Sequence, residues 1–480
     1  MTGLRFAEAS GRWVLLATVL GSAMAMLDGT VVNLALPRIA DDLDASFQDL
    51  QWIVNGYTLA LAALILVGGG LGDRFGRRRV FLLGAVAFTV ASVLCAASVG
   101  ITMLIGARVL QGVAAAMLMP GSLAIIEASF VPQERGRAIG AWSGFGGVAT
   151  AIGPFLGGWL VDAASWRFIF LLNVPLGVAV VVVGLRHVPE SRDPTATGRI
   201  DAPGAALGAL ALAGLTLGLT QESWPLAVIG GALLVTFVVV ERRTQRPLVP
   251  MSLFSSRTFS GTNAVTLLLY GALGVVFFLL GLVLQGPLGY SPLQAGAATV
   301  PITLAMLLLS SRAGALADRI GPRLPMTVGP VLVAIAMLLL ARIDASSTYV
   351  TDVLPGVVVF GLGLALTVAP LTATALGAVD DDHAGVASGV NNAVARTGQL
   401  LAVAAIPAIA GFAPGAAVPA DDLLAGFATV MRFAAATTLV AAAVAFATVR
   451  RTGPPTEAPP WHCAAGGPPV AIDAATTSRH

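Results

Sequence analysis

Two ionisable side chains, Asp28 and Arg108, lie within long apolar stretches of the sequence. An ionised group inside a membrane span is costly, so each should face a cavity or an ionic partner. Burial favours the neutral carboxylic acid, whereas a nearby guanidinium favours the carboxylate. We therefore predict that Asp28 carries a proton and that Arg108 adjusts how readily this proton is released. A static ion pair that locks two helices together is the alternative interpretation.

The overall composition is that of a chain whose main solvent is lipid. Hydrophobic residues make up 56% of the 480 residues and charged residues only 11%, whereas soluble domains carry roughly 25% charged residues. The mean hydropathy is +0.87. The net charge is +2 and no concentrated basic run indicates a nucleic-acid surface. These values predict an integral protein of the cell membrane, surrounded by the lipid bilayer, with no nucleic-acid partner.

Metal, cofactor and enzymatic chemistry are not indicated. The histidines fall in predicted loops and in the C-terminal tail without ligand spacing, and the two cysteines are far apart. A nucleophilic Ser or Cys inside a span would need a positioned His, and none is available there. We expect no metal, no cofactor and no catalytic residues. The residues concerned are His187, His383, His462, His480, Cys95 and Cys463.

Apolar stretches long enough to cross a bilayer, roughly 20 residues each, occur about fourteen times. They form a block of six, a pair and a second block of six, which predicts an all-α membrane protein with a 6+2+6 arrangement. The predicted spans are 13–36, 50–71, 80–98, 101–125, 136–160, 168–185, 203–220, 224–240, 262–284, 295–316, 325–340, 353–376, 386–412 and 423–449.

The same pattern divides the chain into five parts. We expect a cytoplasmic N-terminus at 1–12, a six-helix half at 13–190 and a linker with two extra transmembrane helices at 191–258. A second six-helix half follows at 259–449. The segment 450–480 is rich in Pro, Gly and Ala, which predicts a disordered cytoplasmic tail.

Charge on the loops predicts the orientation of these spans. Loops after even-numbered spans are rich in Arg, whereas loops after odd-numbered spans collect Asp. Because basic loops stay on the cytoplasmic side, both termini should be cytoplasmic. Asp28 lies nine residues before Pro37 and Arg108 seven residues after Ile101, so both lie about 10–14 Å from the outer end of their helices at ~1.5 Å per residue.

An internal repeat relates the two six-helix blocks. The segment at 69–78 recurs at 314–323, and other Pro and Gly landmarks recur in the same order about 245–250 residues later. Both copies start from the same side of the membrane, so the repeat is parallel. Two such halves around a central site are the plan of transporters that alternate their access.

Four motifs resemble a known family. The 69–78 segment is similar to the signature loop of the major facilitator superfamily, and residues 27–37 resemble the first-helix motif of its fourteen-helix drug:proton antiporters. The Arg108 region resembles the fourth-helix proton-coupling motif. The fifth span resembles the antiporter motif, except that Ala149 replaces a usual Gly. Its residues here are Gly140, Gly153, Pro154, Gly157 and Gly158.

The resemblance and the residue types suggest roles for the loop and the fifth helix. The loop should act as a latch in which Asp73 meets a helix dipole or an Arg across the interface between the halves; topological anchoring by the arginines alone is the alternative. Small residues and Pro154 in the fifth helix favour close packing and a bend. The loop residues are Gly69, Asp73, Arg74, Gly76, Arg77 and Arg78, with Asp318 and Arg319 in a weaker second copy.

Several polar and aromatic residues in the spans are candidates for a substrate cavity. Residues 392, 396 and 399 share one helical face, which suggests handling of a substrate or anion; inter-helix hydrogen bonding is the alternative. The aromatic residues could instead anchor the helices at the membrane interface. The candidates are Asn33, Trp52, Asn55, Tyr57, Gln111, Trp142, Asn391, Asn392 and Arg396.

These observations predict a secondary transporter that exports small amphipathic drugs or antibiotics in exchange for protons. It is expected to function as a monomer. A major facilitator importer, or an exporter of one narrow metabolite that serves self-resistance, shares much of the same sequence pattern. An enzyme or a channel fits less well because catalytic groupings and a selectivity ring are not indicated.

Overall fold

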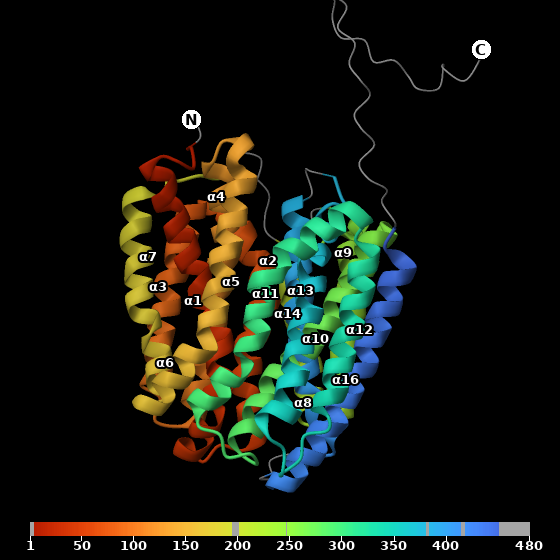
Figure 1. Ribbon diagram of the computed structural model, residues 1–480. Coiled ribbons are helices and arrows are strands. Elements are labelled where there is room, and N and C mark those ends of the chain that lie inside the picture. The colour runs from red at the N-terminus through yellow and green to blue at the C-terminus, as the bar shows by residue number, and fades with distance from the viewer. Residues whose placement is uncertain (1–3, 194–200, 246, 381–383, 414–417, 451–480) are drawn as a thin grey trace, which may run out of the picture.

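The computed structural model describes residues 4–193, 201–245, 247–380, 384–413 and 418–450, and this part of the chain is almost entirely helical (Figure 1). One isolated β-bridge joins Leu4 to Phe130. The predicted tail lies outside the described residues from 451 onward, so its predicted disorder stays a prediction.

The helices of the first half and of the following pair are, in chain order, α1 (Ala9–Leu43), α2 (Phe47–Phe75), α3 (Arg77–Ala96), α4 (Ile101–Ser129), α5 (Pro132–Ala163), α6 (Arg167–Leu171), α7 (Asn173–His187), α8 (Ala202–Thr220) and α9 (Trp224–Arg243). Those of the second half are η1 (Met251–Ser255), α10 (Arg257–Gln285), α11 (Pro292–Ile320), α12 (Arg323–Leu340), η2 (Tyr349–Val353), α13 (Leu354–Leu376), α14 (Ala384–Ala404), α15 (Ile406–Ala410) and α16 (Ala420–Thr448).

Thirteen helical stretches among the described residues are long and apolar enough to cross a bilayer, with α6 and α7 forming one of them. Each of them coincides with one of the fourteen predicted spans, and the observed and predicted ends differ by no more than about two helical turns. The remaining predicted span corresponds to α14 and α15. Helix α14 is too polar to join that set because it carries Asn391, Asn392, Arg396 and Gln399, and α15 has only five residues.

Two predicted spans are not single helices. The sixth breaks at Leu172, three residues before Pro175, and the thirteenth breaks at Ala405, two residues before Pro407. Proline lacks the backbone N–H that a continuous helix needs and clashes with the preceding turn. Each break thus lies just before a proline, although other prolines, such as Pro37 and Pro120, lie within unbroken helices.

Helices α1–α7 and α10–α16 form two bundles that lie side by side (Figure 1), and α8 of the extra pair contacts both of them, through α2 and through α14. The bundles meet through the C-terminal part of α5 and the N-terminal part of α11. A Cβ atom at Gly158 would collide with the backbone of Pro292, and one at Gly296 with the backbone of Pro154. Asp162 accepts hydrogen bonds there from the Ser291 hydroxyl (2.7 Å) and the Leu293 amide (3.2 Å).

The same two helices diverge toward the end of the molecule where the N-terminus lies (Figure 1). On α5, side chains added at Gly140, Gly144 or Gly147 would meet no atom within 4 Å. On α11, Leu307 and Leu308 are exposed. Helices α5 and α11 are thus in contact at the end remote from the N-terminus and apart at the other end, whereas α2 and α14 of the two halves stay in contact, with a Cβ atom at Gly389 lying 2.9 Å from Leu66.

Replacing Gly158 by Ala should weaken the closed end, because the added methyl overlaps the α11 backbone. We expect a loss of about 1–3 kcal/mol, typical of overpacking, measured as a lower melting temperature of the purified protein. Gly144→Ala on the same helix is the matched control and should melt no lower than the wild-type chain. Equal melting temperatures for the two variants would contradict the packing described above.

Candidate functional site

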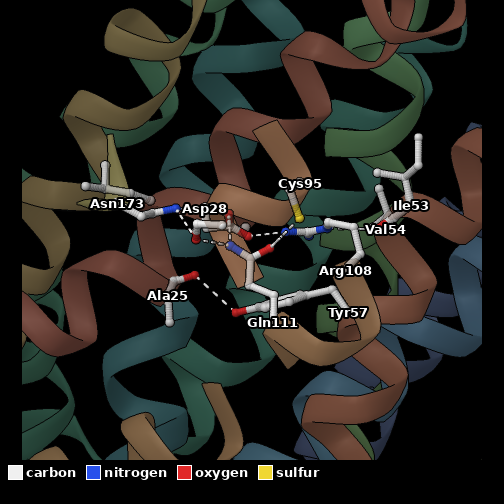
Figure 2. Close-up of polar contacts among 12 residues, drawn as sticks. Ala25, Asp28, Ile53, Val54, Tyr57, Cys95, Arg108, Gln111 and Asn173 are labelled. Atoms are coloured by element: carbon white, nitrogen blue, oxygen red, sulfur yellow. Dashed lines mark hydrogen bonds and ion pairs between the residues drawn. The ribbon is translucent and has the colours of Figure 1, made fainter. Parts of the chain in front are cut away.

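The structure brings Asp28 and Arg108 together in the interior of the first half (Figure 2). The Arg108 guanidinium forms an ion pair with Asp28 Oδ2, and the two side chains are each 1% exposed. Nε of Arg108 also donates to the carbonyl of Ile53 at 3.0 Å. The pair therefore joins α1, α2 and α4 at one point, where water is excluded.

Amide and hydroxyl groups complete the network around this pair (Figure 2). Gln111 accepts a hydrogen bond from Arg108 (2.6 Å) and donates to Asp28 Oδ1 (2.8 Å) and to the Ser92 hydroxyl (2.9 Å). Asn173 also donates to Asp28 Oδ1 (3.4 Å) and to Ser92 (3.2 Å). The Asp28 carboxylate thus accepts hydrogen bonds from three side chains, two on α4 and one on α7.

Two aromatic rings lie against the guanidinium. Its central carbon is 4.4 Å from the centre of the Tyr57 ring and 5.9 Å from that of Phe170. A guanidinium over a ring face gains cation–π attraction, which is larger in a desolvated site. The Tyr57 hydroxyl contacts the carbonyl of Ala25 at 3.4 Å. Tyr57 is therefore a wall of the ion-pair site, although the sequence suggested it as a substrate contact.

Ser92 and Asn173 are members of the network that sequence analysis missed. Asn173 is the first residue of α7, directly after the break at Leu172. A lone Asn beside a proline in an apolar run was a usable signal, because such a residue needs a partner in a membrane. Ser92 gave no signal, since a single Ser within a span commonly bonds its own helix, and Ser92 does donate to the Phe88 carbonyl.

The other cavity candidates of the first half are dispersed. Trp142 donates to the Ser22 hydroxyl (3.0 Å), which ties α5 to α1, and Trp52 is half-buried. Asn55 is fully buried, and neither its amide nitrogen nor its oxygen has a partner. Asn33 lines a small gap between the halves at their closed end, with Oδ1 unpaired.

The candidates on α14 separate into two groups. Asn391 donates to Asn263 (3.1 Å) and to Thr266 (2.9 Å) on α10, which is the inter-helix bonding that we considered as the alternative. Arg396 donates to Gln399 at 3.1 Å on the same face of α14. Asn392 is exposed and bonds the Ser388 carbonyl of its own helix. Asn391 is therefore engaged between helices, whereas substrate handling by Asn392 and Arg396 stays a prediction.

The loop between α2 and α3 contacts a different partner from the one predicted. Asp73 pairs with Arg77 at 2.7 Å within the first half, whereas we expected an Arg of the second half or a helix dipole. The Arg77 amide bonds the carbonyl of Ser191, and the Arg78 amide bonds Glu190 (3.1 Å). The loop is therefore fastened to the segment that follows α7, because that segment returns across the same membrane face.

Glycine at position 76 is required by this turn. Its φ of 111° lies in the region that side chains avoid, and a Cβ atom there would overlap the Glu190 carboxylate. At Gly69, by contrast, an added Cβ atom would lie 3.7 Å from the Pro120 side chain, an ordinary contact distance. In the second copy Asp318 and Arg319 are both exposed and make no ion pair or hydrogen bond within the described part of the chain. The weaker second latch stays a prediction.

The small residues of the fifth helix contact two different neighbours. Cβ atoms at Gly153 and Gly157 would collide with Thr30 and Val31 of α1, whereas Gly158 and Pro154 contact α11. Gly140 contacts neither, because it lies where the halves have separated. The motif thus divides into a tightly packed end, which closes the molecule, and an open end.

Removing one member of the buried pair should be far more costly than removing both. Arg108→Gln leaves the Asp28 carboxylate buried without its counter-ion, which typically costs about 3–5 kcal/mol. The double variant Asp28→Asn with Arg108→Gln should recover much of this loss, as measured by thermal unfolding. Arg167→Gln serves as a control because its pair with Asp42 is partly exposed, and such pairs contribute about 0–1 kcal/mol. Equal losses for Arg108→Gln and Arg167→Gln would contradict the argument.

Sequence comparison finds relatives that are named as proteins of antibiotic export and resistance. The chain is 38% identical to the "Probable actinorhodin transporter" of Streptomyces coelicolor, over 82% of this chain and 72% of the relative. It is 35% identical to "Puromycin resistance protein pur8" of Streptomyces alboniger, over 90% of both chains. It is also 35% identical to "Multidrug resistance protein Stp" of Mycobacterium tuberculosis, over 82% of this chain and 75% of the relative.

Solved structures share the fold at low sequence identity. A peptide transporter in complex with sulfate matches with a TM-score of 0.69 at 13% identity, covering 92% of this chain and 96% of that one. A D-xylose-proton symporter matches with a TM-score of 0.67 at 14% identity, covering 92% and 98%. The family model of the Major Facilitator Superfamily matches residues 18–403. The chain therefore belongs to the Major Facilitator Superfamily and is a multi-pass membrane transporter.

Proposed function

We propose that this protein exports small amphipathic drugs or antibiotics across the cell membrane in exchange for protons, as a fourteen-helix antiporter. The observation that carries the proposal is the sealed network in which Asp28 is held by Arg108, Gln111 and Asn173. Protonation of Asp28 removes its charge attraction to Arg108, and so weakens the link between α1 and α4. A proton can thus change the stability of this arrangement of the helices.

The proposed topology is 6+2+6 with both termini in the cytoplasm. In this arrangement α14 and α15 together make the thirteenth crossing, which brings the total to fourteen, and α14 is polar because it faces the interior between the halves. The domain boundaries are then those predicted, at 13–190, 191–258 and 259–449. With this orientation the separated end of the halves opens to the cytoplasm, which is the side from which an exporter loads its substrate.

Unpaired amide atoms are the best candidates for substrate or water contacts in this state. Asn55 has both amide atoms buried without a partner, and Asn33 has an unpaired oxygen. A buried polar group without a partner costs free energy, so these positions favour a ligand or a water molecule with complementary groups. Trp52 and Arg396 are half-buried and extend the proposed contact surface toward both halves.

A narrow exporter for self-resistance is the second candidate. Two of the relatives described above are named for one antibiotic each, actinorhodin and puromycin. Such relatives favour a single compound class, whereas the relative named as a multidrug resistance protein favours breadth. Resistance of an efflux-deficient host to a panel of unrelated antibiotics separates the two. Protection against one chemical class supports the narrow function.

Asp28→Asn should abolish proton-coupled export while preserving the shape of the side chain. The amide oxygen of the substituted side chain still accepts a hydrogen bond from Gln111, but the amide cannot bind and release a proton at physiological pH. We expect that the variant no longer confers resistance and that reconstituted vesicles no longer acidify or alkalinise when substrate is added. The measurement combines a resistance panel with a pH-sensitive dye inside the vesicles.

Asp42→Asn is the matched control, because Asp42 lies on the same helix but pairs with Arg167 at a partly exposed position. It should retain substrate-driven proton movement. Full proton coupling in folded Asp28→Asn would overturn the assigned role of Asp28. If cells that express the wild-type chain were as sensitive as cells with an empty vector to every compound of the panel, drug export itself would be overturned.

A further inference from the structure

A large apolar cavity lies beneath the two extra helices, away from the ion-pair network. Its volume is about 540 Å³, within the range of small-molecule pockets. Helices α8 and α9 form one wall, and α2, α10 and α14 form the other. Because α2 belongs to the first half and α14 to the second, the cavity lies over the contact between the halves.

The cavity has the length of one membrane leaflet. Along α8 it extends from Gly204 to Leu215, which at ~1.5 Å per residue is about 16 Å. Half of a hydrocarbon core of roughly 30 Å is ~15 Å. The deeper wall consists of aliphatic and aromatic side chains such as Leu212, Phe237 and Leu401. An extended hydrocarbon chain fits this shape better than a compact molecule does.

The charged groups near the cavity lie at its shallow end, and the groups that are exposed there are positive. Arg242, in the last turn of α9, is the charged residue in the described lining, and it is exposed. The neighbouring Arg243 is exposed too. Two acids of this region face inward instead. Glu241 is 1% exposed and accepts from the Val249 amide (2.8 Å), and Asp201 caps the Gly204 amide (2.8 Å).

We propose that this cavity binds one acyl chain of an acidic phospholipid, whose phosphate headgroup lies against Arg242. Basic pockets between transmembrane helices favour anionic headgroups, at about 1 kcal/mol for each basic residue near the surface. The bound chain contacts α2 and α14 together, so it stabilises the arrangement in which these two helices of different halves are in contact. The extra pair α8–α9 thereby acquires a function that a twelve-helix plan lacks.

Lipid retention by the purified full-length protein tests this proposal. The protein is placed in nanodiscs that contain equal amounts of phosphatidylglycerol and phosphatidylcholine, and retained lipids are counted by native mass spectrometry. The wild-type chain should retain one phosphatidylglycerol in preference to phosphatidylcholine. Val238→Trp fills the cavity and should remove this lipid. Arg242→Gln should reduce the preference about fivefold, the equivalent of ~1 kcal/mol for one basic residue.

Two neighbouring positions give matched controls. Val239 is 41% exposed and outside the cavity lining, so Val239→Trp should retain the lipid. Arg243 is also outside the lining, so Arg243→Gln should change the preference less than Arg242→Gln does. Equal retention in Val238→Trp and Val239→Trp would overturn the proposal. Loss of binding of an exported dye in Val238→Trp, with lipid retention unchanged, would assign the cavity to substrate instead. Neither outcome depends on proton coupling at Asp28.

Discussion

The arrangement of the first half depends on the burial of one guanidinium. Arg108 is 1% exposed, and a charge removed from water must regain its solvation from fixed groups. Asp28, Gln111 and the Ile53 carbonyl supply those groups from α1, α4 and α2. Because each partner must lie within hydrogen-bond distance, the relative positions of these three helices are tightly constrained. The two rings beside the guanidinium exclude water and make the constraint stronger.

The contact between the halves is of a different kind. At the closed end it consists of small residues that let backbones approach, together with a few hydrogen bonds, some partly and some fully buried. Gln285 donates to the Leu34 carbonyl (3.0 Å), and Gln51 donates to the Val403 carbonyl (2.6 Å). Such contacts can be exchanged for water when the end opens, whereas the Arg108 network cannot be broken without leaving a buried charge. The molecule therefore combines a firmly joined first half with a separable interface.

The two extra helices modify this interface from the side. They contact α2 and α14 around an apolar cavity rather than closing onto them completely. In a bilayer, hydrocarbon chains are available to fill an apolar cavity, so the empty state is not favoured. The helices therefore turn part of the surrounding membrane into a component of the packing between the halves.

Composition and the Arg-rich loops were enough to predict an all-α membrane protein, because apolar length and charge act locally along the chain. The buried charges Asp28 and Arg108 were identifiable for the same reason, since an ionised residue within a span needs a partner. Tertiary structure alone decided which groups surround them. Ser92 and Asn173 join the network because α3 and α7 pack against α1 and α4. The chain after α7 returns to the loop at Asp73, where the Asp193 amide donates to the Asp73 carbonyl (3.0 Å). Such contacts depend on the packing of distant helices, which one sequence does not encode as a local pattern.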